Sequence, residues 1–103
     1  MVPGKGRTVR NALNPVKVVD LHLKSGYNGR DALLRQIETF RGELDSAIRR
    51  GEREIIFVHG VGSGKLRQEL VNALSLYYPS LTFHNAPFSK FGYEGAMLIS
   101  LKK

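Results

Sequence analysis

Three side chains that can exchange protons lie at the ends of two apolar segments. Asp20 and His22 are two residues apart in the valine-rich segment 16–23, and His59 directly follows the apolar run 55–58. Residues two apart in a strand point to the same face, so Asp20 and His22 should lie together. Histidine has an ordinary pKa of about 6.5 and can give or take a proton near neutral pH. Asp20, His22 and His59 are therefore the candidate catalytic residues.

A glycine-rich loop follows His59 and leads into a helical pattern with two basic side chains at its start. Glycine lets the backbone approach a ligand closely, and the N–H groups at the start of a helix attract anions. The sequence therefore predicts a phosphate-binding loop. Its residues are Gly60, Gly62, Gly64, Lys65 and Arg67.

This loop matches neither of two common phosphate-binding motifs. A Walker A loop requires glycine at position 59 and serine or threonine at position 66, where this chain has His59 and Leu66. The dinucleotide-binding fingerprint requires its third glycine one residue later, where Lys65 stands. A glycine-rich turn that only joins a strand to a helix is the alternative interpretation.

Apolar periodicity predicts an α/β fold with the order β-α-β-α-β-β. We expect strands at 16–23, 55–58, 81–86 and 95–101, and helices at 31–50 and from 65 to the turn before Pro79. The first strand is rich in valine, so it is expected to be buried on both faces. Alternation of strands with helices favours parallel pairing of the first two strands through a right-handed crossover.

Side-chain patterns predict which faces are buried. In the last strand, Met97, Ile99 and Leu101 should share one face and Leu98 should take the other. The first helix carries one apolar stripe, made of Leu33, Ile37, Phe40, Leu44, Ala47 and Ile48.

Parallel pairing of the first two strands would also bring the polar residues together. The carboxyl ends of parallel neighbours lie at one edge of a sheet, and ligands of open α/β sheets collect at that edge. Asp20 and His22 lie at one such end, and His59 and Gly60 lie at the other. We therefore predict a single site at this edge.

Composition limits the class of protein. The chain has 103 residues, no cysteine and a net charge of +7. One domain fits this length, and the lack of cysteine excludes a disulfide scaffold and a cysteine-based zinc site. No segment is apolar for long enough to span a membrane, and no secretory signal is recognisable. We expect a cytoplasmic protein without a membrane partner.

The positive charge is concentrated near the N-terminus. Four basic residues precede the first acidic one: Lys5, Arg7, Arg10 and Lys17. We expect residues 1–15 to form a basic, flexible leader or linker and residues 16–103 to form the domain, within a longer protein. A basic surplus of this kind suits contact with nucleic acid.

Three blocks of the sequence resemble the Smr domain, the small MutS-related family. Residues 19–22, Val-Asp-Leu-His, are similar to the family's Leu-Asp-Leu-His motif. Residues 58–67 are similar to its His-Gly-x-Gly loop with the helix start that follows, and residues 92–97 to its closing glycine-rich block. The resemblance covers about residues 16–103. Leu23 and Met97 depart from it, because the family often has glycine and threonine there.

This resemblance implies a two-layer α/β sandwich with a mixed four-stranded sheet, occurring as the C-terminal domain of a larger bacterial protein. Family members that keep the Asp-x-His triplet are associated with endonuclease activity, including RNA cleavage at stalled ribosomes and DNA nicking. Members without that histidine are associated with binding to nucleic acid or the ribosome. Because Asp20 and His22 are both present, the resemblance implies an endonuclease whose partner is RNA or DNA, with the ribosome as a further candidate. A non-catalytic binding module and an interaction domain are the alternatives.

Phosphodiester cleavage needs a base, an acid and stabilisation of the charge on the phosphate. We assign the acid or base role to His22, oriented by Asp20, and treat His59 as a second such residue or a phosphate ligand. Backbone N–H groups of residues 62–66 would hold the phosphate, with charge from Lys65 and Arg67. No cofactor is expected; a divalent metal held by Asp20, His22 and His59 is the second mechanism.

Other chemistry-bearing residues have plainer interpretations. Phe88, Phe91 and Tyr93 lie in the expected loop 87–94, where base stacking is conceivable but packing in the core or at a hinge is favoured. His84 is expected to be a sheet residue without a catalytic part.

Overall fold

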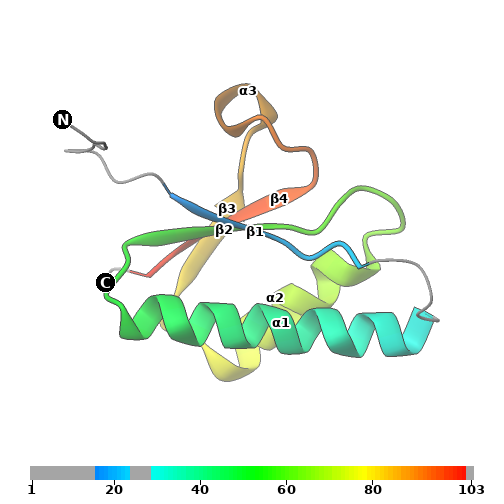
Figure 1. Ribbon diagram of the computed structural model, residues 1–103, viewed down its shortest axis with the longest axis horizontal. Helices are drawn as coiled ribbons and strands as arrows, with labels where there is room; N and C mark the ends of the chain where they lie inside the picture. The colour runs from blue at the N-terminus through cyan, green and yellow to red at the C-terminus, as the bar shows by residue number, and fades with distance from the viewer. Residues whose placement is uncertain (1–15, 24–28, 102–103) are drawn as a thin grey trace, which may run out of the picture.

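The computed structural model describes residues 16–23 and 29–101 (Figure 1). The predicted leader, residues 1–15, lies outside the described residues. The elements are β1 Lys17–Asp20, α1 Gly29–Arg49, β2 Glu54–Val58, α2 Lys65–Tyr77, β3 Thr82–Asn85, α3 Phe88–Phe91 and β4 Ala96–Ser100. The predicted α/β order is confirmed, and α3 is a single turn inside the segment that we expected to be loop. Within the described part of the chain, no helix is long and apolar enough to cross a membrane.

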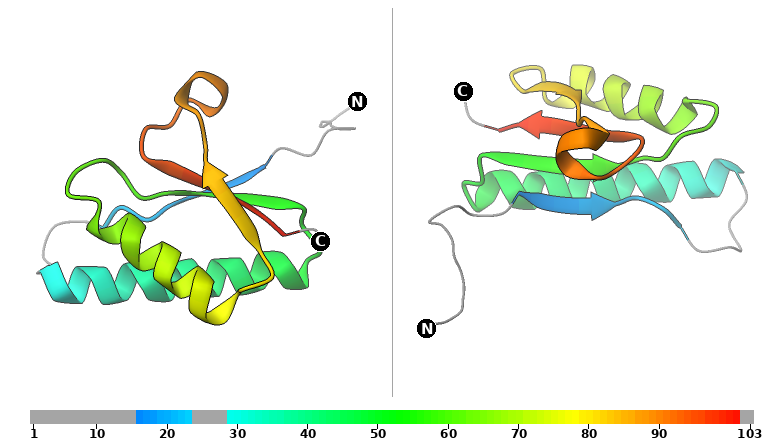
Figure 2. Two further views of the ribbon diagram at one scale, coloured as in Figure 1. Left: turned by 180° about the vertical axis from the view of Figure 1, so that it is seen from behind. Right: turned by 90° about the horizontal axis from the view of Figure 1, so that it is seen from above.

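The strands form one mixed sheet in the order β1-β2-β4-β3. β1 and β2 are parallel, with Asp20 opposite Val58, whereas β4 is antiparallel to both β2 and β3. The last strand of the sequence therefore lies between β2 and β3 (Figure 2). This arrangement places the carboxyl ends of β1, β2 and β3, together with the start of β4, at one edge of the sheet.

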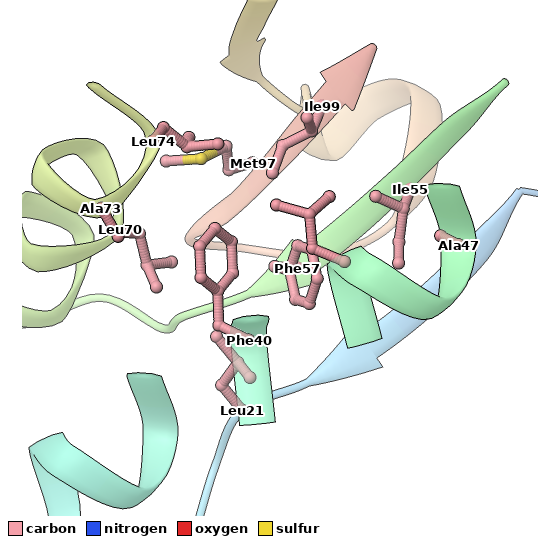
Figure 3. Close-up of a cluster of buried hydrophobic side chains, with 11 residues drawn as sticks. Leu21, Phe40, Ala47, Ile55, Phe57, Leu70, Ala73, Leu74, Met97 and Ile99 are labelled. Carbon is pink, nitrogen blue, oxygen red and sulfur yellow. The ribbon is translucent and has the colours of Figure 1, made fainter. Parts of the chain in front are cut away.

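Helices α1 and α2 pack on the same face of the sheet, which makes the two-layer sandwich (Figure 1). Phe40, Leu44 and Ala47 of α1 are fully buried because their spacing puts them on one stripe of the helix. The rings of Phe40 and Phe57 meet edge to face with their centres 4.7 Å apart. Figure 3 shows the core around them, which also contains Leu21, Ile55, Leu70, Ala73, Leu74, Met97 and Ile99. Each large apolar side chain buried in this way contributes about 1.5–3 kcal/mol.

The opposite face of the sheet carries a smaller apolar cluster. Ile56, Ala86, Ala96 and Leu98 are its buried members, and Phe91 of α3 packs against them. Leu98 thus faces away from Met97 and Ile99, as predicted. The short helix α3 lies on this side of the sheet, away from α1 and α2 (Figure 1).

Two predictions about burial were wrong. β1 is an edge strand, with Lys17 and Asp20 exposed and its two valines half-buried. Val19 faces the helices but lies at the margin of the sheet, and Val18 lies on the face that the long helices do not cover. Ile48 is 42% exposed. At 3.6 residues per turn it lies about 80° around α1 from Phe40, at the margin of the buried stripe.

Polar contacts join α1 to the C-terminal end of α2. The Tyr78 hydroxyl donates a hydrogen bond to Asp45 Oδ1 at 2.6 Å, and the Arg41 guanidinium lies 3.9 Å from the centre of the Tyr77 ring. Burial, followed by the bond to Asp45, raises the pKa of the Tyr78 hydroxyl, which therefore stays protonated as a donor. These contacts hold the C-terminal end of α2 against α1. Because α2 is one continuous helix, they also help to position its N-terminal end, which the loop after His59 leads into.

Candidate functional site

The end of β1 is fixed by the residue between Asp20 and His22. Leu21 is buried; its N–H donates to the Val58 carbonyl at 2.9 Å. The Gln36 side-chain amide of α1 donates in turn to the Leu21 carbonyl at 2.9 Å. Leu21 is thus held between the neighbouring strand and the helix layer. Asp20 and His22, on either side of it, are both exposed to solvent.

Asp20 and His22 are joined through the backbone. The His22 N–H donates to Asp20 Oδ1 at 2.9 Å. This bond fixes the direction of the chain after β1. It also fixes the backbone of His22, from which the side chain extends. The His22 side chain is exposed to solvent.

His59, at the end of β2, lies in a more enclosed environment. Its backbone N–H donates to the Gly95 carbonyl at 2.8 Å. Its ring Nδ1 lies 2.9 Å from the Gly60 carbonyl oxygen. Because a carbonyl oxygen only accepts, Nδ1 carries the hydrogen, and the neutral ring has its lone pair on Nε2. That Nε2 atom is buried and has no hydrogen-bond partner among the described residues.

The charge state of His59 follows from this environment. Burial lowers the pKa of the imidazole below its ordinary value; the bond to Gly60 opposes the shift, and the positive charge of Arg67 adds to it. His59 is therefore neutral at pH 7. A neutral ring that donates from Nδ1 suits a role in holding the Gly60 carbonyl.

The loop glycines have backbone conformations that other residues rarely adopt. Gly60, Gly62 and Gly64 have φ values of 82°, 146° and 83°, and a Cβ at any of these positions would meet no atom within 4 Å. The glycines are therefore required by conformation and not by crowding.

The helix that follows the loop begins without a side-chain cap. Gly64 is the N-cap residue of α2 and contributes no side-chain hydrogen bond. Ser63 Oγ accepts weakly from the Lys65 N–H at 3.3 Å. The N–H groups of the first helical turn have no acceptor within the helix, so they can bind an anion.

Gly95 has a different requirement. Its φ is 62°, and a Cβ there would lie 2.3 Å from both the carbonyl carbon and the oxygen of Gly60. The Gly95 carbonyl also accepts from the N–H groups of His59 and Gly60, at 2.8 and 2.9 Å. The start of β4 is thus pressed against the start of the loop, which only glycine allows.

These segments surround an open hollow of about 670 Å³ at the edge of the sheet. It is lined by His59, Gly60, Val61, Gly62, Gly64, Arg67, Asn85, Ala86, Phe88, Tyr93, Glu94, Gly95 and Ala96. The Arg67 guanidinium donates to Asn85 Oδ1 at 3.1 Å, which fixes it beside the end of β3. A fixed cation, loop N–H groups and a neutral imidazole therefore meet in one place.

Comparison with known proteins identifies the family of the chain. The family model of the Smr domain matches residues 19–102. The chain belongs to the Smr domain family. The crystal structure of the Smr domain of Thermus thermophilus MutS2 is similar to it, with a TM-score of 0.67, 27% sequence identity, and coverage of 85% of this chain and 100% of that chain. No curated protein matches the chain. The Smr family binds nucleic acid in general.

The Smr fold brings together only part of the predicted site. His59, Gly60, Gly62, Gly64 and Arg67 line the hollow. Lys65, although exposed, is not among the lining residues, and neither are Asp20 and His22. The last two lie at the end of the adjacent strand, about 4.8 Å from β2 in the direction of strand pairing. The candidate site residues thus form two neighbouring groups, one at the hollow and one at the end of β1.

Several lining residues were not predicted as site residues. Asn85, Phe88, Tyr93 and Glu94 reach the hollow because β4 lies between β2 and β3, which folds the segment before it back beside the glycine loop. The sequence does not encode that strand order in any local pattern. The cluster of aromatic residues among polar and glycine positions was the one signal available.

The metal mechanism lacks a preformed ligand set. Among the described residues, which include Asp20, His22 and His59, no three histidine or carboxylate side chains are close enough to hold one ion. His59 also uses Nδ1 for the Gly60 carbonyl, which leaves only the buried Nε2 as a ligand atom. A metal shared by these three residues would require the Smr domain to rearrange.

Proposed function

We propose that this Smr domain is an endonuclease that binds RNA or DNA and cleaves its phosphodiester backbone. The observation that carries the proposal is the exposed Asp20–His22 pair, placed one strand away from a hollow that contains Arg67 and the glycine loop. A proton-transfer group beside an anion site supports this reaction, because it can supply acid–base catalysis next to groups that stabilise charge on the phosphate. The net charge of +7 favours a polyanionic substrate.

Each part of the site has a role in this proposal. The phosphate binds at the hollow, where Arg67 and the N–H groups that begin α2 stabilise the negative charge that grows in the transition state. His22 accepts the proton of the attacking oxygen, which is the 2′-hydroxyl in RNA or a water molecule in DNA, as that oxygen bonds to phosphorus. The bond from phosphorus to the leaving oxygen then breaks, and the leaving oxygen takes a proton from protonated His22 or from solvent water. Asp20 holds the backbone of His22 in place.

His59 takes a positioning role. Its Nε2 is buried and its pKa is lowered by burial, so protonation of the ring is unfavourable in the folded domain. Its Nδ1 hydrogen holds the Gly60 carbonyl and thereby the start of the loop. His59 thus keeps the phosphate site in shape, and His22 carries the proton transfer.

The second candidate function is a binding module that docks on nucleic acid or the ribosome without cutting. It is favoured by one observation: Asp20 and His22 do not line the hollow. In this alternative the hollow binds a backbone phosphate, and Asp20 and His22 take no part in a reaction. Both functions place the protein in the cytoplasm, where such partners are found.

A cleavage assay tests the proposal. End-labelled single-stranded RNA and duplex DNA are incubated with the full chain, with EDTA or with Mg²⁺ or Mn²⁺, beside the double variant Asp20→Ala/His22→Ala. His84→Ala is the matched control, because His84 is an exposed histidine on β3 outside the hollow. Cleavage that persists in EDTA and disappears only in the double variant supports the acid–base reaction.

Two other outcomes redirect the proposal. Cleavage that requires a divalent metal would give Asp20 and His22 ligand roles. Salt-sensitive binding without cleavage under any condition would overturn the endonuclease and leave the binding module.

A further inference from the structure

The hollow has an apolar side as well as a polar one. Seven large hydrophobic side chains are exposed in the described part of the chain, and three of them line this hollow: Val61 at 79%, Phe88 at 60% and Tyr93 at 40% exposure. Exposed apolar side chains that gather in one place mark a binding surface. Arg67 and the glycine loop supply the polar side. A ligand of this hollow should therefore combine an anion with a flat apolar group.

The short helix α3 holds Phe88 in place. The N–H groups of Lys90 and Phe91 donate to the Pro87 carbonyl at 3.1 and 3.0 Å, and the Gly92 N–H donates to the Phe88 carbonyl at 2.7 Å. Phe91 anchors the turn by packing against the apolar cluster on the sheet. Because α3 is already fixed by these contacts, the Phe88 ring loses little conformational entropy when it stacks on a ligand.

We propose that Phe88 and Tyr93 bind an unpaired nucleobase next to the phosphate held by Arg67 and the glycine loop. This inference rests on the proposed function and names its substrate class, which is single-stranded nucleic acid. A base within a duplex has both faces stacked on its neighbours, whereas an unpaired base can offer a face to an aromatic ring. Because every base has such a face, the site discriminates by strandedness and little by sequence.

Binding of labelled oligonucleotides tests this inference. Fluorescence anisotropy compares a short single strand of uridine or thymidine with a blunt duplex of equal length. Loss of one stacking ring should weaken single-strand binding by about 5- to 100-fold in Phe88→Ala and in Tyr93→Ala, with a change of less than about twofold for the duplex. Leu76→Ala is the matched control, because it removes an apolar side chain that is 69% exposed and lies outside the hollow. It should change neither affinity.

Salt dependence separates base stacking from phosphate contact. Arg67→Ala should reduce the slope of log affinity against log salt by about 0.7 for a single strand, because one phosphate contact is lost. Phe88→Ala and Tyr93→Ala should lower the affinity without a change of slope. A single strand of abasic residues should bind the wild-type chain and the two aromatic variants equally.

The outcomes distinguish the two levels of the proposal. A wild-type chain that binds no nucleic acid even at low salt overturns the proposed function. A wild-type chain that binds single strand and duplex equally, and is unaffected by Phe88→Ala and Tyr93→Ala, overturns the base-binding inference alone.

Discussion

Two histidines follow the ends of two neighbouring parallel strands, yet their surroundings differ. His22, after β1, has an exposed side chain, and its backbone N–H is held by the Asp20 carboxylate. His59, after β2, is half-buried, donates from Nδ1 to the Gly60 carbonyl, and has a buried Nε2. The same residue type is therefore exposed to solvent in one place and bonded to a backbone carbonyl in the other.

The position of each strand in the sheet explains the difference. Among the strands that the structure describes, β1 is at the edge and pairs only with β2, whereas β2 lies between β1 and β4. The segment that leads into β4 covers the end of β2 and supplies the Gly95 carbonyl that binds His59 and Gly60. At the end of β1, Leu21 is buried, but Asp20 and His22 on either side of it are exposed. An edge position thus leaves a side chain accessible, and a central position encloses it.

The largest expected effect comes from substitution of His22, with the same substitutions at His59 as the comparison. The Asn amide can replace the Nδ1 donor of histidine but cannot exchange a proton near neutral pH. His22→Asn and His22→Ala should both slow single-turnover cleavage by about 10²- to 10⁴-fold, with nucleic-acid affinity little changed. His59→Asn should keep most of the activity, because it can still donate to the Gly60 carbonyl, and His59→Ala should weaken binding.

Single-turnover rates and anisotropy on the same variants supply the measurement. If His59→Asn loses as much cleavage as His22→Asn, both histidines move protons and the contrast between the two strand ends disappears.

A second comparison concerns two glycines with positive φ. In Gly64→Ala the new side chain meets open space, so only the backbone conformation is unfavourable, at about 1–2 kcal/mol. In Gly95→Ala the same strain is joined by a clash with the Gly60 backbone, and we expect a loss of about 3 kcal/mol or more in the free energy of unfolding.

Urea denaturation of the two variants measures these losses. Equal destabilisation by Gly64→Ala and Gly95→Ala would mean that the start of β4 can move away from the loop, and the enclosure of His59 would then be lost.

The smallest expected effect is the pH dependence of stability due to His59. Its pKa is lowered in the folded domain from about 6.5 in the unfolded chain, so the unfolded chain binds more protons between these two values. The contribution of His59 to the free energy of unfolding is therefore complete above about pH 6.5. It is lost as the pH falls from there through the lowered pKa of the folded domain. The effect is small because the ring is only partly buried.

Unfolding free energies of the wild-type chain and His59→Asn, compared between about pH 5 and 8, test this. The variant should lose less stability on acidification. NMR titration of the His59 ring gives a direct check, and a midpoint at or above the ordinary value would contradict its enclosure.

Much of the fold could be predicted because it depends on local patterns. The spacing of Phe40, Leu44 and Ala47 defines the buried stripe of α1, and the alternation around Leu98 assigns the faces of β4. The resemblance of the motifs to the Smr family was likewise present in the order of residues, and it is confirmed. Both kinds of signal lie within short segments, so they can be read from the amino-acid sequence without the tertiary structure.

Exposure could not be predicted in the same way. The valines of β1 were expected to be buried on both faces, but that required helices on both sides of the sheet. Phe88, Phe91 and Tyr93 formed one group in the sequence, whereas the fold buries part of Phe91 and leaves Phe88 and Tyr93 at the hollow. Each outcome depends on which distant segment covers a residue.

The sequence by itself therefore determined the elements, the family and the chemical types present: a carboxylate, histidines, a glycine loop and basic side chains. Only the tertiary structure decided which of them share a site. β4 lies between β2 and β3, and this position brings Gly95 into contact with Gly60. It also places Asn85 within hydrogen-bond distance of Arg67, and Phe88 and Tyr93 at the same hollow as the glycine loop. The physical reason is that long-range strand pairing, and not local preference, sets the neighbours of each side chain and hence its exposure, hydrogen bonds and pKa.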